Sequence, residues 1–68
     1  MTVKYRLVRR MVGMHQDDSG AIMIPTGSIV ETASTRSTVG IVTASYEGRM
    51  LWVFLHELLE AGKIEPNG

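Results

Sequence analysis

The segment from residue 39 to residue 55 constrains the fold of this 68-residue chain more than any other part of it. Two runs rich in apolar and β-branched residues flank Glu47-Gly48, a pair suited to a two-residue hairpin turn with Gly48 at positive φ. The second run is apolar at all six positions from 50 to 55. A strand in so small a domain normally shows one face to water, so something must cover the other face of this one.

The two-residue turn sets the register of the hairpin. Tyr46 then faces Arg49 and Ser45 faces Met50, and the pairing continues residue by residue to Ile41. The inner face is entirely apolar and suits the interior of a small barrel: Val42, Ala44, Leu51, Val53 and Leu55. The outer face is mixed: Ile41, Thr43, Ser45, Met50, Trp52 and Phe54.

Weaker strand signals surround the hairpin. Val3, Tyr5 and Leu7 alternate with charged residues and predict a strand, and the alternation slips at Val8, where we expect a bulge or the end of pairing. Turn formers crowd residues 13–20, which we expect to be a loop. We expect further strands at residues 21–24, 28–34 and 63–65. A turn is expected at 25–27, and a helical turn at 56–61 with Gly62 as its C-cap.

The length indicates a single domain over residues 1–68, with an amino-terminal strand at 1–12, a loop at 13–20 and a barrel core at 21–65. A chain of this size buries only about 60% of the surface that its unfolded form exposes, so its stability margin is thin. Without cysteine it has neither disulfides nor thiolate zinc sites to support the fold. Oligomerisation is the support that remains.

Several short strands with a helical turn before the last one predict an all-β fold, a small antiparallel barrel in which closure removes bare strand edges. Residues 24–30, the hairpin at 39–55 with its bend at 47–49, and Leu58 and Leu59 resemble the SH3-like small β-barrels over roughly residues 21–65. This resemblance implies an SH3-like barrel and is compatible with protein binding, RNA binding or subunit assembly. The chain does not show the aromatic pair and acidic loop of the proline-binding SH3 domains, since the Asp17-Asp18 loop has no aromatic residue nearby, so polyproline recognition is not expected.

The outer face of the hairpin has two interpretations. In the first, the amino-terminal strand or Leu58-Leu59 folds over the large apolar side chains within one chain, as apolar stripes are more often core than binding surface. In the second, Ile41, Met50, Trp52 and Phe54 form an interface with a second copy of the chain or with a protein partner, since Trp and Met are enriched at interface centres.

A basic amino-terminal strand offers an alternative function. Lys4, Arg6, Arg9 and Arg10 precede the first carboxylate and would serve as nucleic-acid contacts, with Tyr5 stacking on a base. The simpler interpretation is a solvated strand edge that discourages pairing. Zero formal net charge and low aromatic content favour the simpler interpretation.

Catalytic chemistry is not indicated. His15, Asp17 and Asp18 are of metal-ligand types, but no second histidine is spaced to complete a site. No nucleophile is paired with a base, and no glycine-rich phosphate-binding loop is present. We therefore expect no enzymatic activity, no cofactor, no metal and no membrane span, and a cytoplasmic location.

Overall fold

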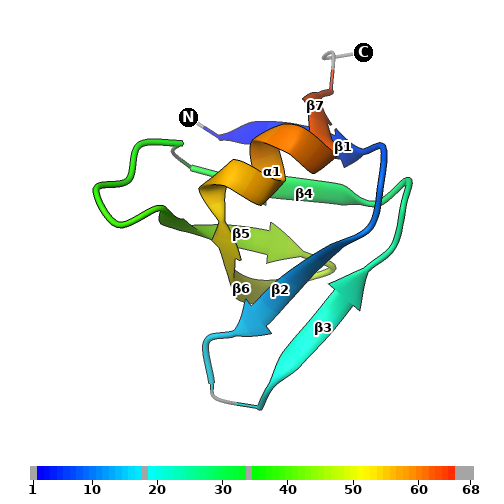
Figure 1. Ribbon diagram of the computed structural model, residues 1–68. Helices are drawn as coiled ribbons and strands as arrows, with labels where there is room; N and C mark the ends of the chain where they lie inside the picture. Colours follow the sequence, from blue (N-terminus) through cyan, green and yellow to red (C-terminus); the bar gives the residue numbers. More distant parts are fainter. Residues whose placement is uncertain (1, 18, 34, 66–68) are drawn as a thin grey trace.

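Over residues 2–17, 19–33 and 35–65, which the computed structural model describes, the chain is mostly β (Figure 1). This agrees with the predicted fold class. The elements in chain order are β1 (Val3–Leu7), β2 (Met11–His15), β3 (Ala21–Ile24), β4 (Ile29–Thr32), β5 (Ile41–Tyr46), β6 (Arg49–Phe54), α1 (Leu55–Ala61) and β7 (Gly62–Ile64).

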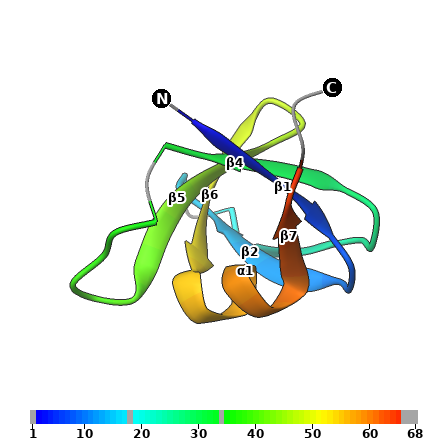
Figure 2. The same ribbon diagram turned by 90° about the horizontal axis from the view of Figure 1, so that it is seen from above.

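The strands form one antiparallel sheet in the order β3-β2-β6-β5-β4-β1-β7. The sheet is not closed, so the predicted closed barrel is wrong: among the described residues β3 pairs with β2 alone and β7 with β1 alone. A helix, not a further pairing strand, lies between β6 and β7 in the chain, and this helix, α1, packs against β6, β7 and β2. Figure 2 shows α1 beside β7.

The β5–β6 hairpin has the predicted register at every pair from Tyr46↔Arg49 to Ile41↔Phe54. Both turn residues have positive φ, 50° at Glu47 and 78° at Gly48, as in the type I′ turns that match strand twist. The predicted inner face is the centre of the core. Its hairpin members Val42, Ala44, Leu51 and Val53 are buried together with Tyr5, Leu7, Met11, Ile24, Val30, Leu58 and Ala61.

Residues 13–15 belong to β2, whereas the sequence predicted a loop over 13–20. Gly13 is buried there, and a Cβ at this position would lie 2.9 Å from Leu51 Cδ1 and 3.3 Å from Ile24 Cδ1. The glycine therefore serves close packing of β2 on the core, not a turn. The predicted strand over residues 1–12 is accordingly two strands, β1 and β2, with the pairing of β1 ending at Leu7 as expected.

The remaining elements differ from prediction only at their ends. The strand expected at 28–34 is β4, which ends at Thr32, and Ser34 lies outside the described residues. Thr32 is buried, and its Oγ1 donates a hydrogen bond to the backbone oxygen of Thr43 at 2.8 Å. The predicted helical turn is α1, and the last strand is one residue earlier than predicted.

Gly62 ends α1 as predicted, but in an extended conformation with φ −113°. Its backbone N–H donates to the oxygen of Leu58, and a Cβ would lie 3.0 Å from that oxygen and 3.1 Å from Tyr5 Cβ. The absence of a side chain is therefore required by the close approach of β7 to α1 and β1.

We predict that Gly62→Ala lowers the free energy of unfolding by about 1–3 kcal/mol, because a methyl group would force backbone atoms apart. Chemical denaturation measures this change. Lys63→Ala, at the exposed neighbouring position, is the control and should stay within about 0.5 kcal/mol of the unmodified protein. Equal stability of the two variants would contradict the packing role of Gly62.

Candidate interaction surface

The outward side of four adjacent strands, β3, β2, β6 and β5, carries large apolar side chains that no other element covers. These side chains and Val39, which precedes β5, are exposed by 38–77% of their surface. We call this surface the apolar face, and its members are Val12, Met14, Met23, Val39, Ile41, Met50, Trp52 and Phe54.

The strand register places these residues side by side. Trp52 on β6 lies between Met14 on β2 and Thr43 on β5, because it pairs with both. Ile41 pairs with Phe54 in the next row of the same face. Val12, two residues before Met14 and therefore on the same side of β2, pairs with Met23 on β3. Trp52 is consequently near the middle of a surface that spans four strands.

Ile41, Met50, Trp52 and Phe54, predicted as an interface group, thus lie together on one side of the hairpin. They remain 38–51% exposed in the single chain. The first interpretation, cover by the same chain, does not describe this structure. Tyr5, Leu7 and Leu58, which were expected to provide that cover, are buried in the core on the opposite side of the sheet.

The sequence interpretation missed the contribution of β2 and β3 to the apolar face. Val12 and Met14 alternate with the buried Met11 and Gly13, which is the pattern of a strand with two apolar sides. The alternation is visible in the sequence, but Gly13 was interpreted as a turn residue, so the predicted strand ended at residue 12. Met23 alternates with the inward Ile24 in the same way.

Two hollows flank Trp52. The first has a volume of about 330 Å³ and is lined only by apolar residues, Met14, Val39, Ile41 and Trp52. The second, about 240 Å³, lies toward β4 and includes Arg36 and Thr32 in its wall. The face is therefore uneven, with a large aromatic ring between two depressions.

Polar groups on this side of the sheet are few and uncharged. On β5, the outward positions not occupied by apolar residues hold Thr43 and Ser45. Thr43 Oγ1 accepts a hydrogen bond from Gln16 Nε2 at 3.2 Å. Charge begins beyond β5, where Glu31 on β4 pairs with Ser45 and accepts a hydrogen bond from Thr2. The apolar face is thus neutral, with charged residues at its margin.

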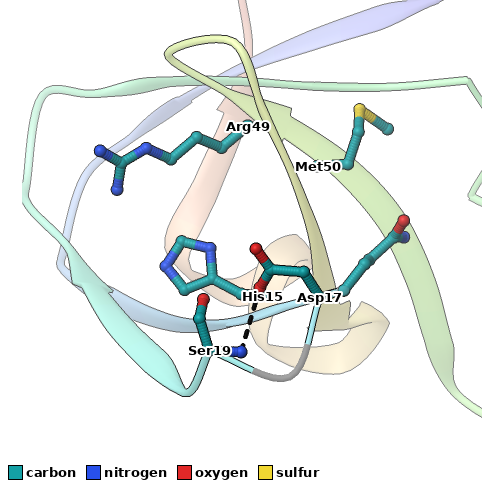
Figure 3. Close-up of a pocket in the computed structure, with 6 residues that line it drawn as sticks. His15, Asp17, Ser19, Arg49 and Met50 are labelled. Carbon is teal, nitrogen blue, oxygen red and sulfur yellow. Dashed lines mark hydrogen bonds between the residues drawn. The ribbon is translucent and has the colours of Figure 1, made fainter.

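A further depression, of about 410 Å³, lies where the β2–β3 connection meets the β5–β6 hairpin (Figure 3). His15, Asp17 and Arg49 border it, and the Ser19 N–H donates to Asp17 Oδ1 at 3.0 Å. Hydrogen bonding from Ser19 lowers the pKa of the Asp17 carboxyl, and the nearby His15 lowers this pKa further. Because Asp17 and Arg49 are exposed, the site is a solvated notch without an enclosed binding position.

Two of the four basic residues predicted as nucleic-acid contacts are paired with carboxylates. Arg6 donates to both carboxylate oxygens of Glu65, at 2.8 and 2.9 Å, and Arg9 donates to Glu60 at 2.8 Å. Lys4 and Arg10 are exposed. Two of the four charges are therefore already compensated by carboxylates, which weakens attraction for phosphates.

Within the described residues, no group of three His, Asp or Glu side chains is placed to hold a metal ion. Asp18, one of the residues considered as a ligand, lies outside that part of the chain. Nor does any described helix have the length and apolar character needed to cross a membrane.

Comparisons of this chain with protein-family models, with curated proteins and with solved structures found no match.

We predict an acid-dependent contribution from the Arg6–Glu65 pair. The hydrogen bonds from Arg6 lower the pKa of Glu65, so the pair stabilises the fold above the ordinary glutamate pKa and loses this contribution as the pH falls through the lowered value. Glu65→Gln should therefore lower the melting temperature slightly at neutral pH, and the difference should vanish in strong acid.

Thermal unfolding followed at a series of pH values checks this, with Glu47→Gln in the exposed β5–β6 turn as the control. A Glu65→Gln effect of the same size at every pH would show that the pair contributes by contact alone, not by charge. The effect should also shrink with added salt, because both side chains are solvent-accessible.

Proposed function

We propose that this chain is a small non-enzymatic interaction or assembly module that binds a protein, either a second copy of itself or another chain, through the apolar face. The observation that carries the proposal is the exposure of eight large apolar side chains on one continuous side of the sheet. The largest apolar patch on an ordinary monomer is about 300–600 Å², and larger patches mark interaction sites.

The composition of the apolar face favours a protein as the ligand. Aromatic residues and Met are enriched at the cores of protein interfaces, whereas charged residues are depleted there. Trp52 is central, with Met14 paired to it on β2 and Met50 two residues away on β6, and Met23 lies farther out on β3; such flexible side chains adapt to a partner. A nucleic-acid site would instead need cationic side chains beside the aromatic ring.

The fold we propose for this module is a variant of the SH3-like barrel that has not closed. The β4–β5–β6 meander, the short helix that follows it and the return of β7 to β1 support this assignment. Barrels of this type serve several functions, so the functional argument rests on the apolar face and not on the fold.

We predict that Trp52→Lys abolishes attraction between molecules in solution, because it places a charge at the centre of the apolar face. Light scattering over a concentration series measures this attraction as rising mass or a negative second virial coefficient. Trp52 is 45% exposed, so the variant should keep the circular dichroism spectrum of the unmodified protein.

Leu59→Lys is the matched control. Leu59 is 53% exposed, comparable to Trp52, but lies on α1 and outside the apolar face. This variant should keep the attraction. A folded Trp52→Lys protein that self-associates as strongly as a self-associating unmodified protein would overturn the proposed function.

A further inference from the structure

We propose that the occupant of the apolar face is a second copy of this chain, packed face to face about a two-fold axis near Trp52. This inference rests on the proposed function, because it identifies the partner of the same surface. Three properties of the face support it: its area, its charge and its shape.

The area matches what a stable dimer needs. The eight side chains are each 38–77% exposed. With large side chains offering about 150–250 Å² each, they present roughly 700 Å² together. Standard protein interfaces bury about 800 Å² from each partner. One face pressed against an identical face would therefore bury up to about 1,400 Å² in total, which lies within the range of about 1,200–2,000 Å² for stable interfaces.

The charge pattern permits self-association. In a two-fold interface the same patch meets itself, so any charged side chain near the axis would approach a like charge. The outward positions of β2, β3, β5 and β6 hold only apolar residues and the neutral Thr43 and Ser45. Charged residues lie at the margins of this surface: Glu31 and Arg36 at its β4 side, and Asp17 and Arg49 at the depression that Met50 also lines. Two neutral faces meet without repulsion at their centre.

The shape of the face leaves room for a side chain of a second copy. The hollow lined by Met14, Val39, Ile41 and Trp52 measures about 330 Å³, and Phe54 on the same face is 51% exposed. A two-fold axis allows a side chain of each copy to enter the hollow of the other, so every such contact occurs twice. Val39, at 77%, is the most exposed member of the face and forms part of the wall of this hollow.

The closing experiment combines solution mass with an intermolecular contact measurement. Sedimentation equilibrium from micromolar to millimolar concentration gives the stoichiometry for the unmodified protein, Trp52→Lys and Leu59→Lys. Nuclear Overhauser spectra are then recorded on a mixture of molecules with isotope-labelled methionine methyl groups and unlabelled molecules. Isotope filtering selects contacts from a labelled methyl group to the Trp52 ring of the other copy. Met11, which is buried, is the internal negative control.

We expect a monomer–dimer equilibrium and intermolecular contacts from Met14 and Met50, with none from Met11. Trp52→Lys should raise the dimer dissociation constant at least about 30-fold, the size of one interface hot spot. Leu59→Lys should leave this constant unchanged.

Other outcomes overturn the inference in distinguishable ways. If the protein is a monomer at every concentration and acrylamide freely quenches the Trp52 fluorescence, the second copy is the wrong occupant. The apolar face then stays open to another protein. A dimer that forms equally well with Trp52→Lys and lacks these methyl contacts uses another surface, and the proposed function then fails as well.

Discussion

The structure depends on one constraint: β6 is apolar on both sides, and the chain has a single core to bury one of them. Leu51 and Val53 point inward and are almost fully buried, while Met50, Trp52 and Phe54 point outward and are about half exposed. Alternation along a strand makes this division unavoidable, because no rotation of β6 could bury both sets. The choice of register by the hairpin turn therefore decides which set faces solvent.

The inward side is completed by elements from both ends of the chain. β1 and β7 pair with each other, and Leu58 from α1 enters the core beside Leu7. The outward side receives no such cover, and instead β2 and β3 extend it with further apolar residues. Because the core of so small a domain is limited, burying the outward surface against another molecule adds a large share to its stability. Under the proposed function, β6 therefore contributes both to the core and to association.

The hairpin was predictable because local chemistry fixes it: Glu47-Gly48 sets the turn, the turn sets the register, and the register sets both faces. The position of β2 was not, because the role of Gly13 depends on contact with Leu51, a distant residue in sequence. Whether the sheet closes could not be predicted from local sequence either, because it depends on how α1, which follows β6 and precedes β7, packs against both strands. The predicted interface residues were therefore correctly grouped on one face, but the extent of that face was underestimated by half.

The central claim is that the apolar face is open in one chain and covered when two chains meet. Trp52 is the chain's only tryptophan, so its fluorescence reports on the centre of this face without interference. The decisive measurement is acrylamide quenching of Trp52 as a function of protein concentration. We expect strong quenching in dilute solution and protection, with a blue-shifted emission, at high concentration. Strong protection that is already complete in the most dilute, monomeric sample would contradict it.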